Sequence, residues 1–423
     1  MARARRLARC TCGHCVGPTR RWSTGCGPAR GSKGRTAGCS AWPATCAHCA
    51  EGRAVAWFQR WRRPCRLGLA LQGGGAHGAY TWGVLDALLE RGYGAPAAIS
   101  GTSAGAMNAV VLAHGLAAAG RGDGQESARE ALARFWQALG RQLPFEWLTQ
   151  GHGARTRLTP TARWWLGWMR LVSPYPNLGS DHNPLRALLE AQIDFEALRH
   201  SPGPELHIAA TRADSGRLRL FQRGELSADV LLASACLPML QPAVLIDGEA
   251  YWDGGYSANP AVFPLVRAPA VTDILLVVLS PWKHVEVPVT ASQVHQRAGE
   301  ISFTAAFLRE MQSLADERER TRKRFWPRGD AARVAALNWH LIDGHDALAP
   351  LSAESRLIAH GPFLEHLRDE GRERTLAWLA QHAATLGRRG SVDLQHWFGG
   401  PPPGQPAAVS EALARRNPLP GSA

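Results

Sequence analysis

The sequence predicts an α/β protein whose central sheet is mostly parallel and is covered by helices on both faces. Residues 66–72 and 273–280 are short apolar runs of the kind that form buried parallel strands. Residues 79–91 instead carry valine and leucine at helical spacing. Because runs of the two kinds alternate along residues 66–280, we expect strands joined by helical crossovers.

The first four elements enclose two glycine-rich turns. A strand at 66–72 is followed by a helix at 79–91, which Gly92 can cap. A second strand at 97–100 precedes a helix at 104–116 that is rich in small residues. We expect this helix to pack closely on the sheet.

The elements after residue 180 repeat the alternation. A helix begins at Pro184, because proline is favoured in a first turn and Asp181 or Asn183 can cap it. The strand-like runs that follow are 205–211, 217–223, 244–252 and 273–280. The sequence thus continues to predict a layered α/β domain.

The C-terminal part is predicted to be mainly helical. Residues 300–324 and 362–383 are long amphipathic segments. We therefore expect an α/β domain at 67–283 and a mainly helical extension at 284–397 that packs on it. Residues 398–423 are rich in Pro, Ala and Gly and are expected to form a loose tail.

Residues 1–66 differ from the rest of the chain. Their net charge of +13 equals that of the whole chain, so residues 67–423 are neutral overall. Eight of the nine cysteines also lie here, at positions 10, 12, 15, 26, 39, 46, 49 and 65. We predict a disordered extension, with an organelle transit peptide or a zinc site at Cys10, Cys12, Cys15, Cys46 and Cys49 as alternatives. The segment has no apolar stretch of the secretory type, so export by that route is not expected.

The stretch LALQGGGAHGAY at 69–80 contains a glycine loop. Gly73, Gly75 and Gly78 fit the G-x-G-x-x-G fingerprint of dinucleotide-binding proteins. That fingerprint needs an acidic residue about 20 positions later to hold the ribose, where this chain has Ser100. A nucleotide-dependent oxidoreductase is therefore disfavoured.

The sequence GTSAG at 101–105 fits G-x-S-x-G, the nucleophile elbow of a strand-to-helix turn. Its strained backbone would aim the Ser103 hydroxyl at the N-terminus of the following helix. Gly101 and Gly105 would let neighbouring backbone pass close by. The motif alone is weak evidence in a glycine-rich chain, but its position between an apolar strand and a small-residue helix matches the geometry that it needs.

The glycine loop would then bind an oxyanion. The amides of Gly73, Gly74 and Gly75 have no side chains to block them. Together with the amide of Ala104, they can point at the oxygen of a tetrahedral intermediate. Each such donor contributes about 3 kcal/mol of transition-state stabilisation.

A serine nucleophile needs a base, and an α/β-hydrolase would use a histidine that follows it in the chain. The candidates are His284, His340, His345 and His360. The α/β-hydrolase fold places several strands before its elbow, whereas only 36 residues separate Leu67 from Ser103. The spacing therefore favours a different base.

Asp253 is that alternative base. It ends a predicted strand, and Gly254 and Gly255 would let the chain turn sharply beside the serine. Because an aspartate has a reference pKa of about 3.9, a Ser/Asp dyad requires an apolar site that raises this pKa. A D-G-G triplet is common in ordinary turns, so its weight comes from its combination with the other two motifs.

These motifs, in this order, resemble the patatin-like phospholipase family. The resemblance rests on GGGAHG at 73–78, GTSAG at 101–105 and DGG at 253–255, with support from SACLPMLQP at 234–242. It covers roughly residues 67–283, and the helical remainder resembles an extension found in some bacterial members. The resemblance implies a three-layer fold with a mostly parallel sheet between helices.

The resemblance also implies a lipid acyl hydrolase. Such enzymes cleave ester bonds of lipids with a Ser/Asp dyad and need no calcium, so no metal or cofactor is expected. Carried over by position, Ser103 would be the nucleophile, Asp253 the base and residues 73–75 the oxyanion donors. The alternative is a catalytically inactive lipid- or acyl-binding scaffold that retains the elbow without turnover.

A lipid substrate makes contact with a membrane or micelle an expectation. The segment ARWWLGWMRLV at 162–172 has the composition of an interfacial lid, although tryptophan-rich helices are more often buried. The basic run 318–324 is a solvated helix face or a contact for anionic lipid. No nucleic-acid-binding pattern occurs in 67–423. We expect a cytoplasmic protein that acts at a membrane surface. The sequence does not specify the head group or acyl length of its lipid substrate, or its oligomeric state.

Overall fold

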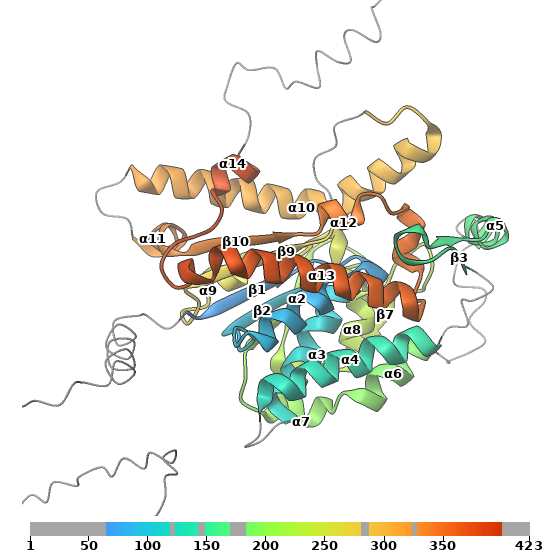
Figure 1. Cartoon of the computed structure of the whole chain (residues 1–423), viewed down its shortest axis with the longest axis horizontal. Coiled ribbons are helices and arrows are strands. Elements are labelled where there is room, and N and C mark those ends of the chain that lie inside the picture. Colours follow the sequence, from blue (N-terminus) through green and yellow to red (C-terminus); the bar gives the residue numbers. More distant parts are fainter. Residues whose placement is uncertain are drawn as a thin grey trace, which may run out of the picture. The chain divides into compact units, whose positions relative to one another are not determined.

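The computed structural model describes residues 65–118, 123–142, 149–169, 183–280, 287–323 and 328–399 (Figure 1). The chain divides into two compact units, and these residues all lie in the second, which runs from Arg62 to Ala423. The predictions for residues 1–64, including the zinc site, and for the tail at 400–423 fall outside the described residues.

An eight-stranded sheet forms the centre of this unit. Strands β10, β9, β1, β2 and β5 lie side by side in this order and are all parallel. β6 and β8 each pair with β5, and β7 pairs with β8, all antiparallel. The bounds are β1 Leu67–Leu71, β2 Ala98–Thr102, β5 Glu205–Arg212, β6 Leu218–Gln222, β7 Val244–Ile246, β8 Glu249–Asp253, β9 Asp273–Val278 and β10 Asn338–Asp343. The predicted mostly parallel sheet is confirmed.

The side chains of β1 explain why this sheet needs two helical layers. All five of its residues are buried, and they alternate between the two faces. Leu69 and Leu71 belong to one hydrophobic core and Ala70 to the other. A strand that is apolar on both faces is stable only with cover on both sides.

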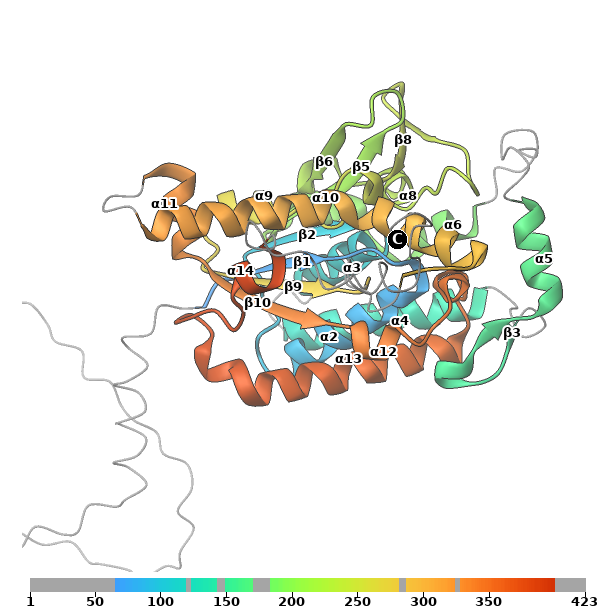
Figure 2. The ribbon, with the colours of Figure 1, turned by 90° about the horizontal axis from the view of Figure 1, so that it is seen from above.

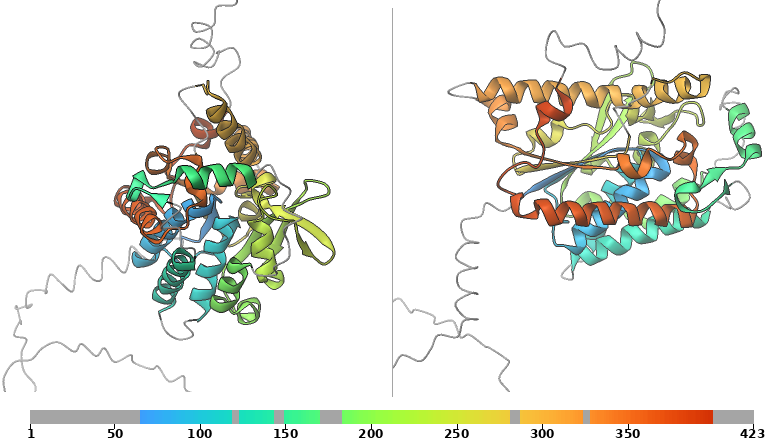
Figure 3. Two further views of the ribbon diagram at one scale, coloured as in Figure 1. Left: turned by 90° about the vertical axis from the view of Figure 1, so that its right-hand side faces the viewer. Right: turned by 45° about the horizontal axis from the view of Figure 1, so that its top comes forward.

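Helices supply that cover, as Figures 2 and 3 show from different sides. The first core contains residues of α2 Gly78–Glu90, α3 Ala104–Ala118, α4 Gly124–Gln142, α5 Pro160–Met169, α6 Pro184–Gln192, α7 Phe195–His200, α8 Ala228–Ser234, α12 His345–Leu348 and α13 Gly361–His382. The opposite core contains residues of α9 Phe263–Arg267, α10 Ala291–Arg322, α11 Gly329–Ala336 and α14 Leu394–Phe398. The three-layer arrangement with a helical C-terminal region is therefore confirmed.

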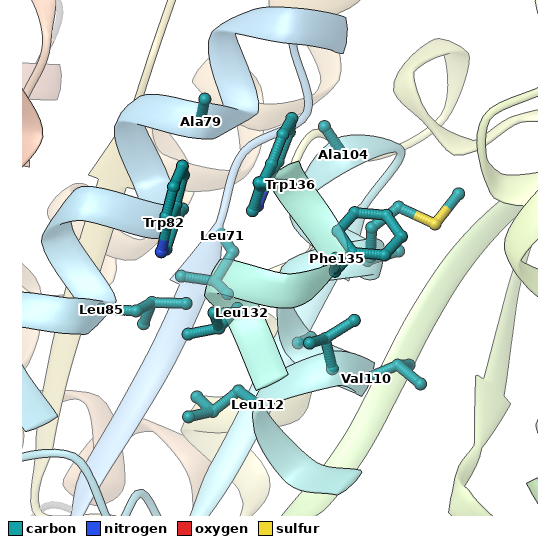
Figure 4. Close-up of a cluster of buried hydrophobic side chains, with 14 of the residues drawn as sticks. Leu71, Ala79, Trp82, Leu85, Ala104, Val110, Leu112, Leu132, Phe135 and Trp136 are labelled. Atoms are coloured by element: carbon teal, nitrogen blue, oxygen red, sulfur yellow. The ribbon is translucent and has the colours of Figure 1, made fainter. Parts of the chain in front are cut away.

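A tryptophan-rich part of the first core lies directly behind the elbow (Figure 4). Trp82 and Trp136 are fully buried there, and each large apolar side chain of this kind contributes about 1.5–3 kcal/mol on burial. Trp136 donates its indole proton to Asn108 at 2.9 Å, and Asn108 donates to the Gly78 carbonyl at 2.9 Å. These two bonds tie α4 and α3 to the start of α2.

The C-terminal region also contributes to the sheet, which the sequence analysis did not predict. β10 lies within the segment expected to be helical and pairs in parallel with β9, with His340 opposite Leu275. In the same region α13 packs on α2, where Arg372 forms an ion pair with Asp86. The sheet and the first core are thus completed by residues well beyond 283.

Candidate active site

Ser103 occupies the turn between β2 and α3. β2 ends at Thr102 and α3 begins at Ala104, so Ser103 alone makes the turn, with φ at 55°. Positive φ is uncommon for a residue with a side chain. The Ser103 amide donates to Ser234 Oγ at 2.9 Å, and its carbonyl accepts from amides of the first turn of α3. These bonds hold the strained turn that the elbow motif predicts.

Gly105 allows this turn to pack against the sheet. A Cβ at position 105 would lie 2.2 Å from the Leu71 carbonyl oxygen. A Cβ on Gly101 would lie 2.6 Å from the carbonyl oxygen of Gly105. Both distances are too short for any side chain, so the elbow needs glycine on either side of Ser103.

Asp253 is the last residue of β8 and is only 2% exposed. Its position follows from its pairing with Ala210 of β5, and its amide donates to the Cys236 carbonyl at 2.8 Å. The carboxylate accepts the Gly255 amide at 2.7 Å. The Ser103 side chain lies close enough to this carboxylate to lower its pKa. The structure therefore places side by side the two residues expected to be nucleophile and base.

Burial raises the pKa of Asp253 from the ordinary carboxylate value to about 7. The hydrogen bond from the Gly255 amide and the nearby Ser103 side chain lower this pKa, but burial has the larger effect. A carboxylate with a pKa near neutrality accepts a serine proton more readily than an ordinary aspartate does. This is the apolar environment that a Ser/Asp dyad requires.

The glycine loop passes directly over Ser103. A Cβ on Gly73 would lie 2.7 Å from Ser103 Cβ, so only glycine fits there. The Gly73 amide, however, donates to Asn259 Oδ1 at 2.7 Å. It is therefore already bonded, in contrast to the expectation that it donates to an oxyanion. Among the described residues, the expected donors whose amides have no hydrogen-bond partner are Gly74, Gly75 and Ala104.

Gln72 and Asn259 are two residues of this site that the sequence analysis missed. Gln72 Nε2 donates to the Asn259 carbonyl at 3.1 Å. Gln72 Oε1 accepts the amides of Leu279 and Ser280 at 2.6 and 2.8 Å. These bonds fasten the glycine loop to the end of β9 and to the segment that follows Asp253. Gln72 adjoins a motif glycine, but no pattern in a single sequence marks its role.

His77, also in the glycine loop, is buried and uncharged. Its Nε2 lies 2.7 Å from Ser355 Oγ. Because the Ser355 hydroxyl donates its own proton to the Ser352 carbonyl at 2.6 Å, it accepts the bond from His77. Burial lowers the pKa of His77 to about 3, and the charge of Arg356 acts in the same direction. His77 is therefore neutral at physiological pH.

No histidine in the described ranges hydrogen-bonds to Ser103 or Asp253. His340 lies in β10, which β9 and β1 separate from β2. It binds Asp273 Oδ1 and Ser391 Oγ, each at 3.1 Å. His345 begins α12 and His360 precedes α13, while His284 falls outside the described residues. In the described part of the chain, the side chain next to Ser103 that could act as its base is therefore an aspartate and not a histidine.

Replacing His340 with Gln should lower stability and leave catalysis unchanged. The ring is fully buried and bridges two polar groups, so a poorly matched amide should cost about 1–3 kcal/mol. Thermal unfolding would measure this loss, and activity per folded molecule should stay within about twofold of wild type. A loss of kcat without any loss of stability would instead favour a histidine triad.

The tryptophan-rich segment lies largely in α5 (Pro160–Met169). Trp164 is 73% exposed, whereas the side chains of 165–170 fall outside the described ones. No helix in the described ranges is both long enough and apolar enough to cross a bilayer. The same ranges hold no group of three or more His, Cys, Asp or Glu side chains suited to a metal ion.

Comparison with known proteins assigns the domain that carries this site. A model of the patatin-like phospholipase family matches residues 69–266, which include the glycine loop, the elbow and the D-G-G turn. A search of curated proteins finds no match. The chain is similar to the crystal structure of VipD from Legionella pneumophila, with 16% identity and a TM-score of 0.35 over 76% of this chain and 68% of that chain. Residues 69–266 are a domain of the patatin-like phospholipase family.

Proposed function

We propose that the protein hydrolyses carboxylic ester bonds of phospholipids or related lipids through an acyl-enzyme on Ser103. The family match supports lipid hydrolysis in general. The observation that carries the finer proposal is that the Ser103 side chain lies close enough to the buried carboxylate of Asp253 to lower its pKa. A serine paired with a carboxylate of raised pKa is an activated nucleophile.

In the proposed first step, Asp253 accepts the hydroxyl proton while Ser103 Oγ attacks the carbonyl carbon. The electron pair of the C=O bond moves to its oxygen, and the amides of Gly74, Gly75 and Ala104 stabilise the resulting oxyanion. When this intermediate collapses, the bond to the alcohol oxygen breaks and Asp253 returns the proton to that oxygen. Water then attacks the acyl-enzyme with Asp253 again as base, which releases the acid and restores Ser103.

A fluorophosphonate probe tests the proposal, because it reacts with a serine whose hydroxyl is activated. We expect labelling of the wild-type protein at Ser103 and none of the Ser103→Ala variant. The alternative function, an inactive lipid- or acyl-binding scaffold, predicts a folded wild-type protein that stays unlabelled. A panel of phospholipids, lysophospholipids, glycerides and p-nitrophenyl esters would then identify the substrate. Absence of both labelling and turnover would refute the proposal.

The activity should rise with pH through an inflection near 7. Only the ionised form of Asp253 can accept the Ser103 proton, and burial raises its pKa to about 7. The value of kcat/KM for a neutral, soluble ester should therefore fall about tenfold for each pH unit below this inflection. An inflection near pH 4 would show that Asp253 titrates as an ordinary carboxylate and would contradict the proposed base.

We propose that the protein meets its substrate at a lipid surface, with α5 as one point of contact. Figure 2 shows α5 and the start of α10 on the same side of the molecule, and Trp164 on α5 is 73% exposed. Trp164→Ala should weaken binding to phospholipid vesicles about fivefold, since interfacial burial of a large aromatic side chain is favourable. Hydrolysis of a soluble short-chain ester should not change. Equal losses in both assays would assign Trp164 to packing instead.

A further inference from the structure

The C-terminal region reaches the glycine loop through the short 3-10 helix η6 (Ala353–Leu357). A Cβ on Gly75 would lie 2.2 Å from the carbonyl oxygen of Arg356, so the two backbones are in direct contact. Next to this contact, Ser355 of η6 accepts the hydrogen bond of His77 at 2.7 Å. Helix η6 therefore packs on the part of the loop that the proposed function assigns to the oxyanion.

The side chain of Arg356 is anchored beside the same loop. Its Nη2 donates to Ser280 Oγ at 3.2 Å. Ser280 follows Leu279, whose side chain would lie 3.2 Å from a Cβ on Gly74. The Arg356 carbonyl thus borders Gly75, and its guanidinium is bonded to the residue that follows the neighbour of Gly74. The charge of Arg356 is therefore held beside the segment that packs on the glycine loop.

Arg356 carries a positive charge at this position, whereas His77 carries none. Burial lowers the pKa of Arg356 and the negative charge of Glu300 raises it, but a guanidinium keeps its proton at any physiological pH. Glu300 forms an ion pair with Arg297 at 3.3 Å, so it offsets the charge of Arg356 only in part. In the described part of the chain, the Arg356 guanidinium donates to one group, which leaves further N–H donors available.

We propose that the charge of Arg356, which the C-terminal region places beside the glycine loop, stabilises the oxyanion formed at Gly74 and Gly75. This inference rests on the proposed function. A fixed positive charge in a partly buried site acts on a developing negative charge without reorganising at the moment of reaction. It strengthens in the transition state, so it should affect kcat rather than KM.

The test compares Arg356→Gln and Arg356→Lys with p-nitrophenyl butyrate, a neutral ester without a phosphate group. We expect the Gln variant to lose about 30-fold in kcat with KM within about twofold of wild type. The Lys variant keeps the charge and should lie within about fivefold of wild type. Arg374→Gln, on the exposed side of α13, is the matched control and should leave kcat unchanged, since within the described ranges the ion pair of Arg374 is with the exposed Asp346.

The Glu300→Gln variant gives a second test, in which kcat should change in the opposite direction. Removing this negative charge should raise kcat about twofold to fivefold, which a merely structural role of the cluster would not produce. This variant also decides the matter if Arg356→Gln does not fold, because a fall in kcat for Glu300→Gln would overturn the inference.

Three further outcomes would overturn the inference about Arg356. In the first, Arg356→Gln keeps the wild-type kcat. In the second, the Gln and Lys variants lose activity and thermal stability equally, and in the third, the loss of activity appears only with phosphate-bearing lipids. The last outcome would make Arg356 a head-group contact. An inactive wild-type protein would instead refute the proposed function, so the two failures are distinguishable.

Discussion

Replacing Asp253 with Asn is expected to lower kcat by about four orders of magnitude. The amide has nearly the shape of the carboxylate but cannot accept the Ser103 proton, and loss of one member of a catalytic unit typically costs about 10⁴–10⁶ in kcat. Release of p-nitrophenol in a single turnover measures the effect. Asp214→Asn, at an exposed carboxylate that pairs with Arg212, is the control and should retain full activity.

The Asp253→Asn variant should be more stable than wild type at high pH. Burial raises the pKa of Asp253 from 3.8 to about 7, so the folded state binds more protons than the unfolded state between these values. The contribution of Asp253 to stability is therefore complete below pH 4 and is lost as the pH rises through 7. Since Asn does not titrate, the stability advantage of the variant should grow to a few kcal/mol by pH 8. Urea denaturation at pH 4 and pH 8 measures it, and a variant that is less stable at pH 8 would contradict the assigned burial cost.

Replacing Gly75 with Ala is expected to lower kcat about 100- to 1000-fold. Gly75 has φ at 58°, and a Cβ would lie 2.2 Å from the Arg356 carbonyl oxygen, so the loop or η6 must shift. Either shift moves the amide expected to bind the oxyanion, and loss of one such donor costs about 10²–10³ in kcat. Fluorophosphonate labelling should slow in parallel, because it passes through a similar charged intermediate.

Gly92→Ala separates the effect of the clash from that of backbone strain. Gly92 also has positive φ, at 78°, but no atom lies within 4 Å of its Cβ position. Both variants should lose about 1 kcal/mol of stability through the strained φ. Only the Gly75 variant should lose kcat. Equal kcat for the two variants would mean that the glycine loop does not act through the geometry of its amides.

The order of strands and helices was predictable because parallel strands must be apolar on both faces and joined by helical crossovers. Two strand features were missed. β10 is a six-residue strand in a region dominated by helical periodicity. Residues 244–252, expected as one strand, form the hairpin of β7 and β8 with its turn at Asp247 and Gly248. An Asp-Gly pair between apolar runs is a hairpin signal, so the second feature was available in the sequence.

Part of the candidate site was predictable from the sequence and part was not. Ser103 and Asp253 stand in short local motifs, so single-sequence reasoning could propose them as partners. The partners that hold the loop are different, because Asn259 meets Gly73 across a separation of 186 residues. Arg356 approaches from still further along the chain. Such contacts depend on the completed tertiary structure, and no local spacing encodes them.

The position of β9 has a practical consequence for expressing fragments. The family match ends at residue 266, whereas β9 begins at Asp273 and lies between β1 and β10. A protein cut at 266 would leave the backbone donors and acceptors of β1 unpaired along a wholly apolar edge, which is a template for aggregation. Soluble recombinant material should therefore require a chain that extends at least through β10.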